Sequence, residues 1–272
     1  MEHGRADAVH AVEASGVGKV FAGRAGEVVA LTDVELTVRA GEFVSLIGPS
    51  GCGKSTLLRL IADLDGASSG ALTVFGKPAH QARLDQDYGI AFQQAGLLPW
   101  RTVAENIALP LELHRVGREQ RRARVAELAE LVHLGDFVDR HPDQLSGGMQ
   151  QRVAIARALA ASPKLLLMDE PFGALDEMTR EYLQSELTRI AAETGAAVVF
   201  VTHSIPEAVF LSDRVVVMSP RPGRITDIVE MPFAGERDEA LRESPAYFER
   251  VTAVREALHG APVARATERG AP

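Results

Sequence analysis

The chain has 272 residues, and its 29 Lys and Arg against 37 Asp and Glu give a formal net charge of −8. This acidic balance argues against a nucleic-acid-binding protein, which needs a basic surface to neutralise phosphates. The apolar fraction of 46% excludes a wholly disordered chain, and a single cysteine excludes a disulfide framework and a cysteine-based zinc site.

The N-terminal segment and the hydropathy of the chain predict a protein that does not itself span a membrane. Residues 1–9 form an N-terminal tail, and residues 1–16 lack the basic start and apolar stretch of a secretory signal. No uncharged apolar run approaches the ~18 residues that a bilayer span needs. If the protein acts at a membrane, we therefore expect it to do so as a peripheral subunit.

The predicted elements alternate between strands and helices. Residues 10–42 hold β-rich segments punctuated by glycine, which predict an antiparallel flank to a central sheet. The segments that follow have the pattern of an α/β domain with a mainly parallel sheet, in which buried strands are apolar throughout. Strands are expected at 43–48, 88–92, 164–169, 196–202 and 214–218, and helices near 54–63, 118–133, 147–161, 177–193 and 205–212.

Three regions follow from this pattern. Apolar residues at three-to-four spacing predict a helical subdomain at about 96–160, inserted between two core strands. With the tail at 1–9, we expect one main domain at 10–230 and a C-terminal extension at 231–272. In that extension, residues 245–258 predict one helix and the last twelve residues predict disorder.

The segment GPSGCGKST fits the phosphate-loop pattern G-x-x-x-x-G-K-[ST] and lies where that motif must lie, after a strand and before a helix. Its glycines let backbone N–H groups converge on phosphate oxygens, and Lys54 reaches the β- and γ-phosphates. The Ser55 hydroxyl can hold Mg²⁺, and Thr56 lies near the α-phosphate. The candidate nucleotide-binding residues here are Gly48, Pro49, Ser50, Gly51, Cys52, Gly53, Lys54, Ser55 and Thr56.

Cys52 has two interpretations. It is a small residue at a variable position of the loop, or its alkylation blocks nucleotide entry.

A second chemical motif ends the predicted strand at 164–169. Asp169 stands at the carboxyl end of this apolar strand, where a carboxylate can bind Mg²⁺ through water. Glu170 lies one residue further on, where a base can polarise an attacking water. We therefore predict a metal ligand followed by a catalytic base.

The segment LSGGMQQRVAIARAL at 145–159 resembles the signature of the ATP-binding-cassette (ABC) ATPases. The phosphate loop, LLLMDEP, GALD at 173–176 and His203 extend this resemblance over about residues 10–230, in the family order. The stretches 97–107 and 201–225 look most like the importer branch for nitrate, sulfonates and taurine. The resemblance implies a P-loop (RecA-like) core with an antiparallel β flank and an inserted helical subdomain.

The resemblance also implies roles for particular residues. Ser146, Gly147 and Gly148 look like the site that closes on the γ-phosphate of ATP held by a second copy. A serine and backbone N–H groups at a helix start suit an anion. Asp176 resembles the residue that links the two active sites across the dimer.

Three further side chains complete the implied site. Gln93 resembles the glutamine that senses Mg²⁺ and the attacking water, although the adjacent Gln94 is an alternative. His203 looks like the switch histidine that contacts the γ-phosphate and orients Glu170. Phe21 resembles the aromatic that stacks on adenine, and a core phenylalanine is the alternative.

The implied protein is the ATPase subunit of an importer, with ATP and Mg²⁺ as its ligands. It is expected at the cytoplasmic face of the inner membrane as a homodimer, with two membrane-spanning permease subunits and, indirectly, a solute-binding protein. The apolar cluster at 97–100 is either their docking groove or part of the subdomain core, and the basic run at 118–124 predicts a solvated helix face. Rival functions are a soluble mechanochemical ATPase of the same superfamily and a nucleotide switch without turnover.

Overall fold

The computed structural model describes residues 10–23, 26–233 and 237–260. The strands in these residues are β1 (His10–Gly23), β2 (Gly26–Arg39), β3 (Phe43–Ile47), β4 (Ser69–Val74), β5 (Lys77–Pro78), β6 (Tyr88–Ala91), β7 (Leu165–Asp169), β8 (Ala197–Val201), β9 (Arg214–Met218) and β10 (Ile225–Glu230). The helices are α1 (Lys54–Ile61), α2 (Ala79–Leu84), α3 (Val103–Leu113), α4 (Arg118–Leu131), α5 (Gly147–Leu159), α6 (Glu177–Thr194), α7 (Ile205–Leu211), α8 (Glu239–Glu243) and α9 (Pro245–Gly260).

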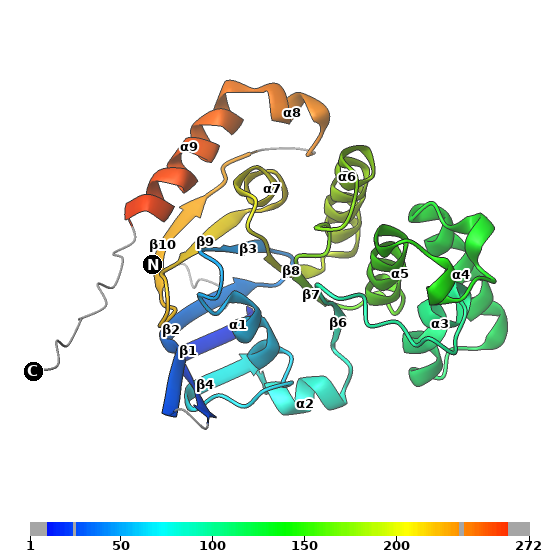
Figure 1. Cartoon of the computed structure of the whole chain (residues 1–272), viewed down its shortest axis with the longest axis horizontal. Helices are drawn as coiled ribbons and strands as arrows, with labels where there is room; N and C mark the ends of the chain where they lie inside the picture. The colour runs from blue at the N-terminus through cyan, green and yellow to red at the C-terminus, as the bar shows by residue number, and fades with distance from the viewer. Residues whose placement is uncertain (1–9, 24–25, 234–236, 261–272) are drawn as a thin grey trace, which may run out of the picture.

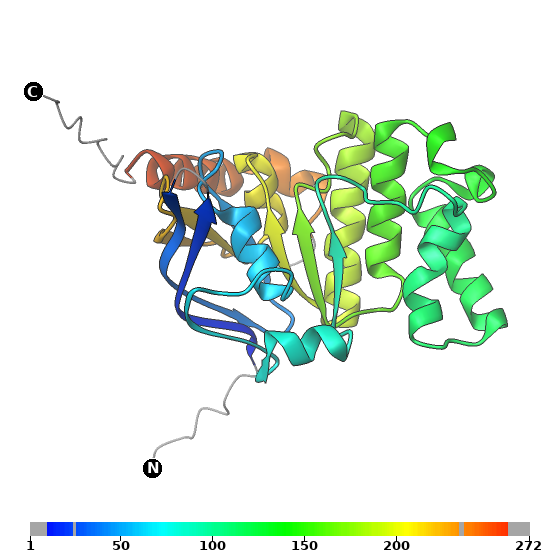
Figure 2. The ribbon, with the colours of Figure 1, turned by 60° about the horizontal axis from the view of Figure 1, so that its bottom comes forward.

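The central sheet has six strands in the order β10-β9-β3-β8-β7-β6. All neighbouring pairs are parallel except β10 with β9, and the arrows of the parallel strands point the same way in Figure 2. The side chains of β3, β7, β8 and β9 are buried on both faces, as their continuous apolar runs predict. The predicted α/β core with a parallel sheet is therefore confirmed.

The antiparallel strands near the N-terminus form a sheet of their own, in the order β2-β1-β4-β5, and are not added to an edge of the parallel sheet. The cause is their alternation of buried and exposed residues, which leaves β1 and β2 with one apolar face to cover. That face packs in one hydrophobic core with α1 and with the side chains of one face of the central sheet. Helix α1 thus lies between the two sheets and contacts β2, β4, β7 and β8.

The other face of the central sheet carries a second hydrophobic core. Phe43 and Ile47 of β3 point into this core, while Val44 and Leu46 point into the first, as the two-residue period of a strand requires. The second core also holds the buried faces of α3 to α7 and of α9. Helices α3, α4 and α5 follow β6 in the chain and gather at the end of the molecule farthest from β1 and β2 (Figure 1).

Near the C-terminus the structure contains helices and strands beyond those predicted from the sequence. Helix α9 covers the helix predicted at 245–258, whereas β10 and α8 were not predicted from the sequence. The predicted tail at 1–9 and the predicted disorder of the last twelve residues lie outside the described residues. Among the helices that the structure describes, none has the length and apolar character that a membrane span requires.

Candidate active site

The phosphate loop joins β3 to α1, and its glycines are required by close packing. Gly53 has φ +108°, and a Cβ on it would lie 2.6 Å from a side-chain carbon of Leu31. A Cβ on Gly48 would lie 2.7 Å from the carbonyl oxygen of Met218. Neither position accepts a larger residue without movement of its neighbour, so the loop is held in one shape.

Lys54 is held inside the loop by the loop's own carbonyls. Its ammonium donates hydrogen bonds to the oxygens of Gly48, at 2.8 Å, and Pro49, at 3.1 Å. The cation therefore lies beside the loop backbone, where a positive charge can meet a phosphate. Cys52 is 1% exposed, with its Sγ 3.8 Å from the same ammonium. This burial favours the interpretation of Cys52 as a small packing residue over the alkylation hypothesis.

Ser55 and Asp169 meet at the carboxyl edge of the sheet. The Ser55 hydroxyl donates a hydrogen bond to Asp169 Oδ1 at 2.9 Å. Burial raises the pKa of Asp169, and the Ser55 hydrogen bond opposes this effect. In the described residues no group of three or more His, Cys, Asp and Glu side chains is arranged to hold a metal ion. One hydroxyl and one carboxylate instead fit Mg²⁺, which keeps several waters and takes few protein ligands.

Glu170 lies at the centre of a three-residue contact. Its φ of +47° turns the chain sharply after β7, and its N–H donates a hydrogen bond to the Val201 carbonyl at 2.9 Å. Its carboxylate accepts a hydrogen bond from Gln93 Nε2 at 3.3 Å and lies 3.2 Å from His203 Nδ1. The three side chains follow β6, β7 and β8, whose carboxyl ends are adjacent. Gln93, and not Gln94, makes the contact to Glu170.

A cavity of about 540 Å³ lies over the phosphate loop. Phe21, which is 40% exposed, borders it, and the Lys19 ammonium lies 4.8 Å from the centroid of the Phe21 ring. The structure therefore places Phe21 at the cavity and not in the core. The lining residues are Phe21, Val28, Ala30, Ser50, Gly51, Gly53, Lys54, Ser55, Thr56, Gln93, Glu170, His203 and Arg221.

Arg221 is a lining residue that the sequence analysis missed. It lies on the turn between β9 and β10, and its guanidinium is within 3.7 Å of the position that a Cβ on Gly51 would take. The turn packs tightly on the phosphate loop, because a Cβ on Gly223 would lie 2.0 Å from the Cys52 carbonyl oxygen. The sequence did contain a signal for Arg221: it is a basic residue in a turn with Pro and Gly, directly after a core strand. The carboxyl end of that strand lies at the edge of the sheet that carries the phosphate loop.

The signature residues lie elsewhere on the chain. Ser146 caps α5 by accepting a hydrogen bond from the Met149 N–H at 3.2 Å, and Gly148 packs against the Ala174 carbonyl. Asp176 caps α6, and its hydrogen bonds with Thr179 lower the pKa of its carboxyl. Ser146, Gly147 and Asp176 are exposed, and none of the signature residues lines the cavity over the phosphate loop. The predicted site residues thus form two separate groups within one chain.

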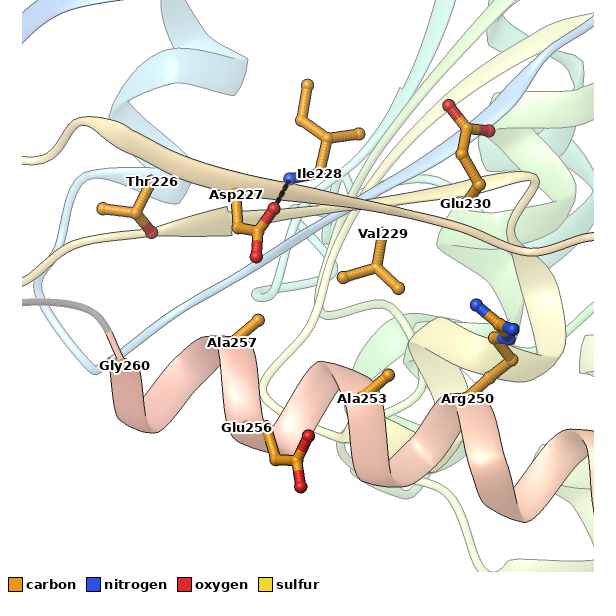
Figure 3. Close-up of a pocket in the computed structure, with 10 residues that line it drawn as sticks. All are labelled: Thr226, Asp227, Ile228, Val229, Glu230, Arg250, Ala253, Glu256, Ala257 and Gly260. Atoms are coloured by element: carbon orange, nitrogen blue, oxygen red, sulfur yellow. Dashed lines mark hydrogen bonds between the residues drawn. The ribbon is translucent and has the colours of Figure 1, made fainter.

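A second cavity, of about 730 Å³, lies between β10 and α9 (Figure 3). Its lining mixes alanines with charged side chains, among them Glu230 and Arg250. None of the predicted site residues borders it. Most of the predicted phosphate-loop residues, together with Gln93, Glu170 and His203, instead border the cavity over the phosphate loop.

Comparison with known proteins decides the family. The family model described as "ABC transporter" matches residues 31–173. An uncharacterized ABC transporter ATP-binding protein of Methanocaldococcus jannaschii is 46% identical over 86% of both chains. The chain belongs to the ABC transporter ATP-binding family. Its enzymatic activity is therefore ATP hydrolysis, as the resemblance implies.

Other ABC relatives are importer subunits by name. The taurine import ATP-binding protein of Burkholderia pseudomallei is 44% identical over 86% of this chain and 91% of its own length. The nitrate import ATP-binding protein NrtC of Synechococcus elongatus is 49% identical over 82% of this chain, which corresponds to 34% of that protein. These relatives confirm the resemblance to the nitrate and taurine branch.

A solved ABC cassette supports the fold. It is a dimeric cassette in a post-hydrolysis state, bound to ADP and Pi, and it is 36% identical to this chain. The TM-score is 0.76 over 82% of this chain and 99% of the other. The predicted ABC ATPase architecture is thereby confirmed.

Proposed function

We propose that this ABC protein is the ATP-hydrolysing subunit of an importer for a small solute of the nitrate, sulfonate or taurine type. The observation that carries the proposal is the contact of Glu170 with Gln93 and His203 beside the phosphate loop. This arrangement aims a carboxylate base at the cavity in which Lys54 and Ser55 lie. The names of the taurine and nitrate relatives support the solute class.

In the proposed reaction, ATP lies in the cavity with its adenine against Phe21 and its phosphates on the loop 48–56. Lys54 and Arg221 offset the phosphate charge. Glu170 accepts a proton from the attacking water, and His203 orients that carboxylate. Bound Mg²⁺ would supply positive charge that offsets the charge of the phosphates. Ser55 and Asp169 are the residues that would hold it, and Gln93 would supply a further oxygen ligand.

The active unit in this proposal is a homodimer. Ser146 and Gly147 are exposed at the start of α5, and with Gly148 they lie away from the chain's own cavity. Such a helix start binds phosphate, so it would complete the site of a second copy. Asp176 would contact the partner's site, and the dimeric form of the similar ADP-bound cassette supports this arrangement.

A mixing experiment tests the shared site. Lys54→Ala and Ser146→Arg variants should each lose ATP turnover, and mixing them should restore part of it. Mixed dimers hold one site with an intact phosphate loop from one copy and an intact signature from the other. The matched control is a mixture of Lys54→Ala with a double variant carrying both changes, in which every site is defective. If the first mixture stays as inactive as the control, the two-copy site is wrong.

Docking on a membrane protein is the remaining part of the proposal. Trp100 is 71% exposed, and Pro99 beside it is also exposed, so the segment 97–100 is not simply core of the helical subdomain. We assign this apolar surface to the cytoplasmic face of two permease subunits, which receive solute from a binding protein. The acidic net charge gives no support to a nucleic-acid partner.

Isolation of the tagged chain from native membranes in mild detergent tests this assignment. A multi-span protein in near-equal amount supports the importer, and its own binding protein can then be screened with nitrate and taurine. Recovery of a soluble dimer alone, or of ribosomal or DNA-repair proteins, would contradict it.

A further inference from the structure

The C-terminal helices pack against the segment that carries His203. Helix α7 begins at Ile205, two residues after His203, and α9 contacts α7 (Figure 1). The Tyr247 hydroxyl of α9 donates a hydrogen bond to the Pro206 carbonyl in the first turn of α7, at 2.9 Å. Helix α9 is therefore hydrogen-bonded to the first turn of the helix that follows His203.

A buried chain of polar side chains extends from α8 to the same segment. Arg242 of α8 donates a hydrogen bond to Gln184 Oε1 at 2.6 Å. Gln184 Nε2 donates in turn to Glu207 Oε1 at 2.9 Å, and Thr202 Oγ1 donates to Glu207 Oε2. Gln184 and Thr202 are each 2% exposed and Glu207 is 8% exposed. Their polar atoms depend on one another for hydrogen bonds, because burial removes them from water.

The far end of this chain holds the backbone on both sides of His203. Thr202 precedes the histidine, and its hydroxyl also accepts a hydrogen bond from the Ser204 N–H at 2.9 Å. Ser204 follows the histidine and caps α7 by accepting from the Glu207 N–H at 3.4 Å. The position of His203 beside Glu170 thus depends on bonds that converge on the backbone and side chain of Glu207.

Arg242 determines which way the Gln184 amide faces. A carboxylate needs donors, so the amide NH₂ must point at Glu207 and the amide oxygen must point away from it. Arg242 supplies the donor for that oxygen, while its guanidinium lies 3.6 Å from the centroid of the Phe210 ring. Without Arg242, the buried oxygen loses its partner and the amide can rotate, which weakens the bond that holds Glu207.

We propose that Arg242 is a positioning residue for ATP hydrolysis: through Gln184, Glu207 and Thr202, the C-terminal segment holds the His203 loop against Glu170. This inference rests on the role proposed above for His203. It gives residues 237–260 a function in the catalytic cycle without any contact to nucleotide.

The test compares three variants of the full chain. Arg242→Ala should lower the kcat for ATP roughly tenfold, in the range expected for a displaced catalytic group, with the KM for ATP unchanged. Arg242→Lys keeps a donor for the Gln184 oxygen and should restore most of the lost kcat. Arg250→Ala, on the neighbouring helix α9 and outside the chain of bonds, is the matched control and should leave kcat as in the wild type. Equal losses in Arg242→Ala and Arg250→Ala, or no loss in either, would overturn the proposal.

Backbone hydrogen exchange provides a readout that does not depend on nucleotide. The amides of Ser204 and Glu207, which donate the hydrogen bonds described above, should exchange roughly tenfold faster in Arg242→Ala than in the wild type, because local opening becomes easier. Tyr247→Phe removes one hydroxyl and keeps the ring, so it should give a smaller increase in the same amides even if Arg242→Ala folds poorly. Unchanged exchange in both variants would overturn the proposal that the C-terminal segment holds the His203 loop in place. If both variants exchange faster as expected but the wild-type chain neither binds nor hydrolyses ATP, only the proposed function is contradicted.

Discussion

Ser55 donates a hydrogen bond to Asp169 at 2.9 Å, although 114 residues separate them in the chain. Ser55 stands in the first turn of α1, and Asp169 is the last residue of β7. Their contact joins the phosphate loop to the adjacent carboxylate edge of the sheet. It brings together two oxygen groups that suit Mg²⁺, which neither segment supplies alone.

The first prediction concerns the metal. Ser55→Ala should raise the Mg²⁺ concentration needed for half-maximal ATP hydrolysis at least about tenfold, because one oxygen ligand is lost. Ser55→Thr keeps the hydroxyl and should behave like the wild type. Titration of ATPase activity with Mg²⁺ for the three proteins measures this. Equal Mg²⁺ requirements in the alanine and threonine variants would remove Ser55 from the metal site.

The second prediction concerns the base. Glu170→Gln should lower kcat by roughly 10²–10⁴-fold, since an amide cannot accept the proton of the attacking water. ATP binding should persist, and gel filtration with ATP should show a stable dimer. Glu177→Gln, an exposed acid in the first turn of α6, is the control. Turnover at the wild-type rate in Glu170→Gln would mean that another group is the base.

The third prediction concerns Arg221. Arg221→Ala should weaken ATP binding roughly 10- to 100-fold, because charge-assisted hydrogen bonds contribute about 1.5–3 kcal/mol. AMP binding should change less, since AMP lacks the phosphates that lie farthest along the loop. Arg224→Ala removes an exposed arginine from the same turn without touching the cavity and serves as the control. Equilibrium binding of ATP and AMP to the three proteins decides whether Arg221 contacts the phosphates.

The fourth prediction concerns pH. Burial raises the pKa of Glu207 above its unfolded value, so the ionised side chain reduces stability. The favourable contribution of the protonated side chain is fully present below pH 4.5, the ordinary pKa of a glutamate, and is lost as the pH rises through the folded pKa. Glu207→Gln does not titrate. The free energy of unfolding of the variant minus that of the wild type should therefore increase from pH 4.5 to pH 7, measured by urea denaturation. A constant difference would contradict the raised pKa.

The sequence predicted the central sheet and the phosphate loop because both depend on local patterns. Uninterrupted apolar runs identify β3, β7, β8 and β9, and glycines before Lys54 identify the loop. The position of Glu170 directly after an apolar strand predicted its role as a base, whereas Gln93 and His203 received their roles only from the family resemblance.

The parts that the sequence did not predict depend on long-range packing. The separate sheet of β1, β2, β4 and β5 arises because its apolar face packs on α1, which no short segment reveals. Arg221 reaches the cavity because Gly223 packs on the Cys52 carbonyl, and Arg242 matters only through Gln184, 58 residues away in the chain. Contacts of this kind appear once the chain is folded.

The exposure of Trp100 has a practical consequence, since it is the chain's one tryptophan. Trp100 is 71% exposed on the segment before α3, and it does not border the cavity over the phosphate loop. Intrinsic fluorescence excited at the indole band thus comes from a single, water-exposed probe. ATP binding to the isolated protein should leave its emission maximum unchanged, whereas burial against a permease should shift the emission to shorter wavelength. One unlabelled side chain can thereby report assembly of the transporter separately from nucleotide occupancy.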